Sequence, residues 1–262
     1  MTHSIIQVDA FADQPFTGNP AAVCLLDKPA SEDWMQAVAM EMNLSETAFL
    51  YPTDTGYNLR WFTPASEVNL CGHATLASAF VLFSDNLVDK SKPVSFLTKS
   101  GELKASYVDG FIELDFPAIK SVPCSPPDGL LESLGVQAQY VAKAGEDYMV
   151  IVSSDEIVKD VNPDFNLLGR LPVRGVAVSG RSRFDFDFVS RFFAPLYGIN
   201  EDPVTGSAHC ALAPYWANEL GKTKLSAYQA SARGGKLSLE LKGDRVLLSG
   251  KAVITLRGKL HC

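Results

Sequence analysis

Alternating apolar and polar residues predict short strands and few long helices in the first half of the chain. A helix is expected behind Ser31, where apolar residues at helical spacing lead to Met42 and end at Asn43. A second helix opens at Gly72 and is apolar on nearly all sides, which is typical of a helix enclosed by a sheet. Strands are expected at residues 5–10, 21–26, 57–62, 94–98, 101–108 and 111–116.

The second half repeats this order. A short helix is expected near residues 164–169, and a longer one runs from Gly206 to Leu220 and is closed by Gly221. Pro123 to Pro127 is the one proline-rich connector, so a domain boundary is expected at residues 118–127. The strands are expected near residues 140–152, 173–179, 184–193, 227–232, 236–241, 244–248 and 251–257.

A self-match at one fixed offset indicates that the chain is duplicated. Five residues recur 131 positions later, which is half of the 262-residue chain. They are Arg60, Phe62, Pro64, Val68 and Asn69, matched by Arg191, Phe193, Pro195, Ile199 and Asn200. Each copy then enters a Gly-x-Ala helix start, at Gly72 and at Gly206, after three extra residues in the second copy.

These patterns predict an α+β fold of two similar halves, residues 1–118 and 119–262. Many short strands with one long apolar helix in each half suggest a sheet that wraps that helix. Each half is long enough to bury its own core.

Composition and charge narrow the class of protein. A hydrophobic content of 47% with 20% charged residues is ordinary for a soluble globular chain. The net charge of −7, without a basic run, argues against nucleic acid as a partner. The N-terminus lacks the pattern of a signal peptide and no apolar run could span a bilayer, so we expect a cytoplasmic protein with no membrane contact.

The five cysteines fit reduced thiols better than disulfides or a zinc site, because their number is odd and their spacings are irregular. The four scattered histidines show no metal-ligand cluster either, so no metal is expected. Motifs for nucleotide phosphates, dinucleotides, nucleophilic serines and zinc proteases are all absent from the sequence.

In a duplicated protein, the cleft between the halves is the default ligand site. The starts of the two long helices, at Gly72 and Gly206, would offer free N–H groups there, and such groups bind carboxylates. Either glycine could instead only cap its helix or allow close packing. Because the two glycines occur as a pair, a role in ligand binding is favoured.

The positions just before the two helices differ, with Cys71 in the first copy and Asp202 in the second. Two cysteines there would suggest a two-thiol racemase, and the carboxylate disfavours that mechanism. Cys71 alone reads as a small buried residue. Asp202 could be functional or a turn former.

Two histidines lie near the helix starts. His73 is one residue inside its helix and could move a proton near neutral pH or merely pack locally. His209 lies one turn inside its helix, where a structural role is favoured. Glu46 stands at an element boundary beside Ser45, where an isolated glutamate is usually a solvated surface group.

Several blocks together nevertheless resemble the PhzF-like phenazine-biosynthesis isomerases. They are FTGNPAAV (16–23), NLSETAF (43–49), RWFTP (60–64), CGHATLASA (71–79) and EDPVTGSA (201–208). The family shares the diaminopimelate-epimerase fold, in which each half is a barrel-like, mostly antiparallel sheet around a central helix. Ala74 departs from the proline common at that position, which bears on the helix start rather than on the chemistry.

The resemblance implies a cofactor-independent isomerase that moves a proton within a small carboxylated metabolite, and a homodimer is possible. Carried over residue by residue, it implies catalytic roles and substrate-binding roles. The catalytic residues are Glu46, His73 and Asp202, and the substrate-binding residues are Asn19, Ser45, Gly72, Gly206 and Ser207. An epimerase or racemase on the same fold and a non-catalytic small-molecule-binding protein are the alternatives.

Overall fold

The structure is a computed structural model that describes residues 2–261. The chain divides into two compact units, one formed by residues up to 115 together with those from 249 on, and one formed by residues 116–248. Strands β8 (Phe111–Pro117) and β16 (Arg245–Gly250) carry the chain from one unit to the other.

The first unit is a continuous ladder of strands with two parallel joints. In the ladder, β17, β1 and β2 pair antiparallel, β2 and β3 parallel, β3 and β4 antiparallel, β4 and β6 parallel, and β6, β7 and β8 antiparallel. Its other elements are β1 (Thr2–Ala10), β2 (Asn19–Leu25), α1 (Glu32–Met42), β3 (Glu46–Thr53), β4 (Gly56–Phe62), β5 (Glu67–Val68), α2 (Gly72–Ser84), β6 (Val94–Thr98), β7 (Gly101–Val108) and β17 (Ala252–His261). The parallel joints fall where α1 and α2 provide crossovers.

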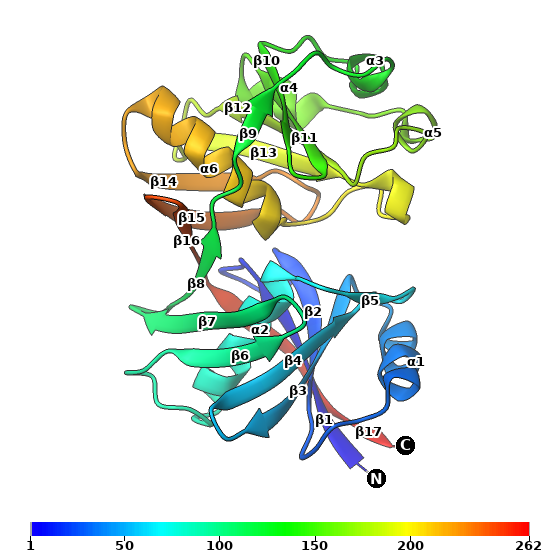
Figure 1. The fold of residues 1–262 in the computed structure, drawn as a ribbon, viewed down its shortest axis with the longest axis vertical. Helices are drawn as coiled ribbons and strands as arrows, with labels where there is room; N and C mark the ends of the chain where they lie inside the picture. Colours follow the sequence, from blue (N-terminus) through cyan, green and yellow to red (C-terminus); the bar gives the residue numbers. More distant parts are fainter. Residues whose placement is uncertain (1, 262) are drawn as a thin grey trace. The chain divides into compact units, whose positions relative to one another are not determined.

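Helix α2 is the centre of this unit, as its apolar sequence predicts. It is buried on almost every side and contacts β1, β2, β3, β7 and β17, so strands from distant parts of the ladder surround it (Figure 1). Helix α1 covers the outer face instead, where Met35 and Val38 pack on Phe49 and Phe62. Ser31 caps α1 by accepting a hydrogen bond from the Trp34 N–H, as predicted.

The second unit repeats the succession of antiparallel and parallel joints. Strands β9, β10 and β11 pair antiparallel, β11 and β12 parallel, β12 and β13 antiparallel, β13 and β14 parallel, and β14 and β15 antiparallel. Its elements are β9 (Ser121–Pro123), α3 (Leu130–Leu134), β10 (Tyr140–Ala144), β11 (Asp147–Val152), α4 (Asp155–Asp160), α5 (Phe165–Leu168), β12 (Val176–Arg181), β13 (Phe188–Phe193), the 3-10 turn η1 (Pro195–Tyr197), α6 (Gly206–Leu220), β14 (Lys224–Gln229) and β15 (Gly235–Lys242). Helix α6 holds the place in this order that α2 holds in the first unit, and the duplication itself stays a prediction.

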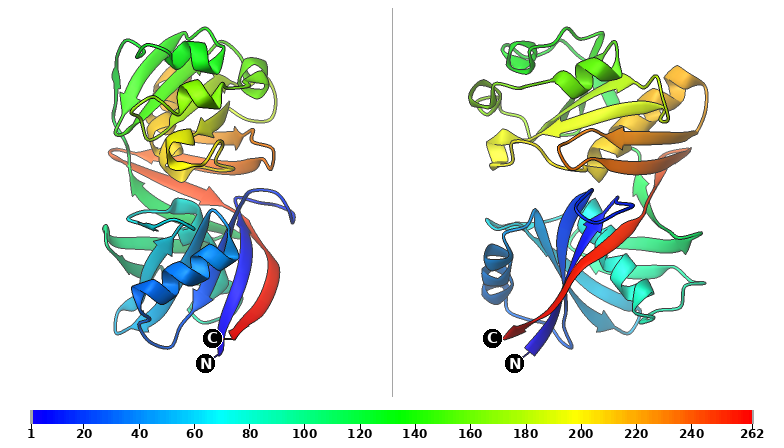
Figure 2. Two further views of the ribbon diagram at one scale, coloured as in Figure 1. Left: turned by 90° about the vertical axis from the view of Figure 1, so that its right-hand side faces the viewer. Right: turned by 180° about the vertical axis from the view of Figure 1, so that it is seen from behind.

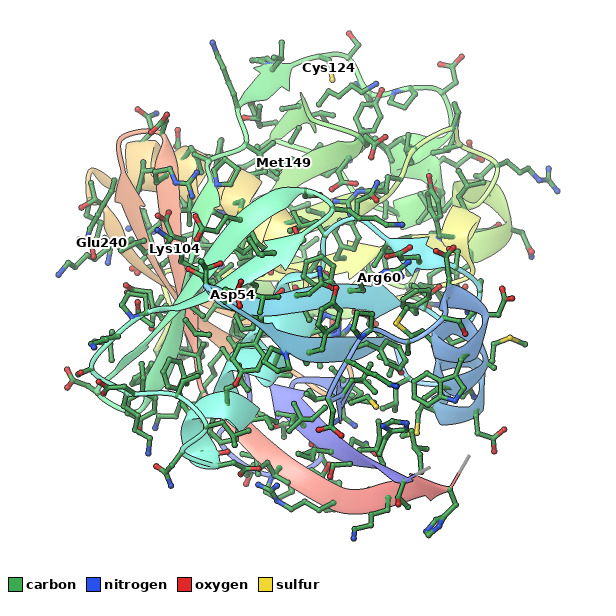
Figure 3. The ribbon with its side chains drawn as sticks, turned by 60° about the horizontal axis from the view of Figure 1, so that its bottom comes forward. Asp54, Arg60, Lys104, Cys124, Met149 and Glu240 are labelled. Carbon is green, nitrogen blue, oxygen red and sulfur yellow. The ribbon has the colours of Figure 1, made fainter. Side chains whose placement is uncertain are left out.

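The repeated sequence motif forms the same ion pair in each unit. Arg60 of β4, labelled in Figure 3, donates from Nε and Nη2 to both carboxylate oxygens of Glu67, each at 2.7 Å. Arg191 of β13 does the same to Glu201, at 2.7 and 3.0 Å. Each guanidinium also lies over the phenylalanine two residues on, Phe62 or Phe193. The two clamps fix the loops that lead to α2 and α6.

This correspondence corrects the alignment made from the sequence in three places, because Val68 and Asn69 are no longer matched to Ile199 and Asn200, nor Cys71 to Asp202. Glu67 and Glu201 are 134 residues apart, as are Gly72 and Gly206, so the three extra residues precede the glutamates. The residue before α6 is therefore Thr205, and it is Thr205, not Asp202, that corresponds to Cys71. Asp202 takes the place of Val68, because its N–H bonds the carbonyl of Phe192 as β5 pairs with β4.

The C-terminal segment does not stay in the second unit as the predicted division at residues 118 and 119 implies. Strand β17 pairs along the whole of β1, from Thr2 opposite His261 to Ala10 opposite Ala252, and Figure 2 shows the two strands side by side. The apolar pattern predicts this strand but carries no information about its partner. Among residues 2–261, none of the helices is long and apolar enough to cross a membrane.

Candidate functional site

A corner of the first unit gathers residues from two strand starts and one helix start. Because β2 and β3 run parallel, Asn19 and Glu46 at their beginnings lie at the same edge of the ladder. Strand β4 runs antiparallel to β3 and ends at this edge, with Phe62 opposite Thr47. The chain then enters α2 there, so the ladder's connectivity alone brings His73 toward Glu46.

His73 is the hub of this corner. Its Nε2 lies 3.0 Å from Oε2 of Glu46, and its Nδ1 lies 3.2 Å from Nδ2 of Asn19 and 3.5 Å from Sγ of Cys71. The side chains of His73 and Glu46 are only 6% and 14% exposed. A histidine and a glutamate in contact and shielded from water can exchange a proton or hold one between them.

The electrostatics favour a charged His73. Burial by itself lowers the pKa of His73, but Cys71 and Glu46 raise it, and the net result is a pKa well above the usual value of 6.5. Burial raises the pKa of the Cys71 thiol to about 11, with a further rise from Glu46. The thiol is therefore neutral at pH 7, and the carboxylate of Glu46 is the charge that stabilises the imidazolium there.

Asn19 suits either protonation state of His73. With its amide nitrogen toward Nδ1, it donates to a neutral imidazole, and with the amide reversed its oxygen accepts from an imidazolium. Asn19 is fully buried, and its amide nitrogen lies 3.2 Å from Nδ1 of the His73 ring.

The same corner offers ligands for a metal ion. One donor atom each from Glu46, Cys71 and His73 lies within 4.8 Å of the other two. A carboxylate, a thiolate and an imidazole form a donor set that suits Zn²⁺ with one position left open.

Gly72 and Ser45, the other predicted site residues of the first unit, are neighbours in sequence of this cluster. Gly72 is the first residue of α2, between Cys71 and His73. Ser45 directly precedes Glu46 at the entry to β3, but among the described residues it makes no hydrogen bond to His73 or Glu46.

Asp202, Gly206 and Ser207 belong to the second unit, around the start of α6. Asp202 accepts a hydrogen bond from the Thr205 hydroxyl at 2.5 Å, directly ahead of Gly206. Ser207 is the second residue of α6, and its Oγ accepts a hydrogen bond from Nη2 of Arg174 at 3.0 Å.

Arg174 and Asp147 complete this second corner, and the sequence analysis missed both. Asp147 begins β11, and Arg174 donates from Nε to its Oδ1 at 2.8 Å and from Nη2 to its Oδ2. Burial raises the pKa of the Asp147 carboxyl and outweighs the opposing effect of Arg174. In the sequence each is a single charge beside an apolar strand, a pattern that surface residues share.

His209 has a structural environment. Its Nδ1 lies 2.8 Å from the Thr205 carbonyl oxygen, which can only accept, so Nδ1 carries the proton and Nε2 accepts from the Ser190 hydroxyl at 3.1 Å. The ring is completely buried, and burial lowers its pKa to about 4. His209 is a neutral core histidine that ties α6 to β13.

Solved structures of low sequence identity share this fold. A probable proline racemase of Agrobacterium radiobacter, with bound carbonate, superposes with a TM-score of 0.65 at 11% identity, covering 99% of this chain and 93% of its own. At that identity the likeness shows the fold alone, a mixed α+β fold of the diaminopimelate-epimerase type, as predicted.

Closer similarities define the family. The model of the phenazine biosynthesis-like proteins (PhzC-PhzF) matches residues 8–258. A protein of Pseudomonas aeruginosa named as an uncharacterized isomerase is 54% identical over all of both chains. The crystal structure of a PhzF-family protein of Enterococcus faecalis has a TM-score of 0.96 at 42% identity and covers all of both chains. The chain belongs to the PhzF-like family, as its sequence motifs predict.

Proposed function

We propose that this protein is a cofactor-independent isomerase that moves a proton within a small carboxylated substrate. The Glu46–His73 contact of 3.0 Å in a buried corner carries the proposal, because it supplies a proton acceptor and a charged partner where α2 begins. Membership of a family that includes proteins named as isomerases supports it.

In the proposed reaction, the Glu46 carboxylate removes a proton from a carbon next to a carbonyl group or a conjugated double bond. The electron pair left on that carbon moves along the conjugated system, and the proton returns from Glu46 to a different carbon. The product is an isomer of the substrate, and Glu46 ends as the carboxylate. General acid–base catalysis of this kind typically contributes about 10²- to 10⁴-fold.

Other groups have supporting roles in the proposal. The imidazolium of His73 orients Glu46 and stabilises the negative charge that develops, while Asp202 in the second unit positions the substrate. The N–H groups at Gly72 and Gly206, where α2 and α6 begin, bind the carboxylate of the substrate, with Asn19, Ser45 and Ser207 as further contacts.

Epimerisation at one carbon is the second candidate, and the position of Cys71 favours it. The neutral thiol lies 3.5 Å from His73 and could return the proton from a different direction than Glu46 removes it.

A screen of carboxylated metabolites in deuterated buffer tests both candidates. We expect deuterium to enter a new carbon of the true substrate, and entry at the original carbon with inversion would establish epimerisation instead. Glu46→Gln should lower the exchange rate by at least about 100-fold, whereas Glu41→Gln, an exposed glutamate of α1, should leave it unchanged.

Full exchange in a folded Glu46→Gln variant would remove Glu46 from its role. Binding of an acidic ligand without any proton exchange by the wild type would identify a binding protein.

A further inference from the structure

The second unit holds a counterpart of the Glu46–His73 corner, and its chemistry is opposite in charge. Thr47 pairs with Phe62 in the first unit and Val176 pairs with Phe193 in the second. Because Phe62 and Phe193 are equivalent positions of the repeat, Thr47 corresponds to Val176. His73 and Ser207 correspond likewise, since each is the second residue of its long helix.

Counting back along the equivalent strands places Arg174 at the position of Ser45 and Gly175 at the position of Glu46. A Cβ atom on Gly175 would lie 2.2 Å from Cζ of Phe192, so a side chain at this position would require the Phe192 ring to move. Arg174 reaches past it, with its guanidinium 5.7 Å from the centre of the Phe192 ring. Where the first unit pairs a glutamate with a histidine, the second pairs an arginine with a serine.

The partners of Arg174 hold its guanidinium in one orientation and leave part of that group accessible to solvent. Asp147, whose side chain is only 8% exposed, takes Nε and Nη2, and Ser207 accepts from Nη2 as well. The Arg174 side chain is 36% exposed, and among the described residues no partner contacts its Nη1. A guanidinium fixed along one side, with the other open to solvent, is preorganised to bind an anion.

We propose that Arg174 is a specificity-determining residue that binds an anionic group of the substrate, with the Ser207 hydroxyl beside it and Asp147 as the positioning residue. This inference rests on the proposed function, because an isomerase of carboxylated substrates needs a group that recognises their negative charge. It assigns the substrate class as small acids with an anionic group that Arg174 binds.

NMR titration with benzoate, and with benzamide as its neutral analogue, tests the assignment. In the wild type, benzoate should shift the Arg174 Nε–H and Ser207 amide signals saturably, and benzamide should not. Loss of a charge-assisted hydrogen bond should make the Kd of Arg174→Gln about 10- to 100-fold weaker. Arg174→Lys should recover part of the affinity, and Asp147→Asn should weaken benzoate binding less than Arg174→Gln does.

Two variants separate this inference from the proposed function. Arg183→Gln removes an exposed arginine of the same unit, paired with Glu156 at 3.2 Å, and should bind benzoate like the wild type. Glu46→Gln should also bind benzoate normally while losing proton exchange. If benzoate leaves the Arg174 and Ser207 signals unmoved, or binds Arg174→Gln as tightly as the wild type, the assignment is overturned. If Glu46→Gln keeps its exchange, only the proposed function fails.

Discussion

Arg60 and Glu67 form a two-pronged ion pair that closes the loop between β4 and α2, and Arg191 and Glu201 form its counterpart before α6. In each pair the side chains are at most 20% exposed, so water screens the interaction little. These clamps give the recurring arginines, Arg60 and Arg191, the same structural role in the two units.

Removing either arginine should therefore destabilise the protein. Arg60→Met removes the two hydrogen bonds that Arg60 donates to the Glu67 carboxylate. We expect the free energy of unfolding to fall by about 1–3 kcal/mol. Arg191→Met should have a similar effect for the same reason. Urea unfolding measures both, with Arg183→Met as the exposed control, expected to change stability by less than about 0.5 kcal/mol. Equal stability of all three variants would refute the clamp.

His73 should lose its raised pKa when Glu46 is neutralised. In Glu46→Gln the carboxylate that stabilises the imidazolium is gone while burial remains, so the pKa of His73 should fall. An NMR titration of the His73 ring signals in both proteins measures this change. An unchanged titration would show that the pair is not coupled.

The same pair should stabilise the fold below neutral pH. Because the folded pKa of His73 lies above its unfolded value of 6.5, its contribution is complete below pH 6.5 and is lost as the pH rises through the folded pKa. The difference in unfolding free energy between wild type and His73→Gln should shrink over that range. A difference that stays constant from pH 6 to pH 9 would contradict the assignment.

His209 should act in the opposite direction. Its folded pKa of about 4 lies below the usual 6.5, so the unfolded chain takes up a proton first as the pH falls. Stability should be complete above pH 6.5 and decline toward pH 4, by about 3 kcal/mol at most. His209→Gln should lack this part of the acid sensitivity, whereas His261→Gln, an exposed control, should keep it. Long-range ¹H–¹⁵N spectra should show a neutral ring protonated on Nδ1 at pH 6.

Zn²⁺ should bind at the Glu46, Cys71 and His73 donors and inhibit proton exchange by occupying the base. Competition with a chromophoric chelator gives the affinity, and EDTA should restore activity. Cys71→Ser should weaken binding by more than about tenfold, since even residues that only support metal ligands contribute that much. Cys124→Ser removes an exposed free thiol and should change nothing. Equal Zn²⁺ affinity in both serine variants would place the metal elsewhere.

Much of the fold follows from local sequence pattern. Helix α6 has the predicted bounds, Gly206–Leu220, with Gly221 in the left-handed conformation at its end. Strands β6 and β7 also match their predicted ranges because turn residues bound them. The short helices α3 and α4 were missed, since five or six residues are too few for a helical period to stand out.

The candidate site was less accessible to sequence reasoning. Glu46 was selected only by family resemblance, because nothing in its neighbourhood shows that β3 pairs parallel to β2 and faces α2. Arg174 and Asp147 lie 27 residues apart and meet only through the pairing of β11 with β12. Asp202 was matched to Cys71 in place of Thr205 because the sequence shows that the second copy has three extra residues but not where they fall.

The pairing of β1 with β17 also constrains how the molecule is made. The opening strand of the first unit waits for a partner encoded more than 240 residues later, whereas all of residues 116–248 leave the ribosome before that partner does. The internal unit can therefore finish folding during synthesis while the outer one stays an open ladder with an exposed edge. A delay late in translation would therefore prolong the exposure of the unpaired edge of β1, rather than affect the segment being translated.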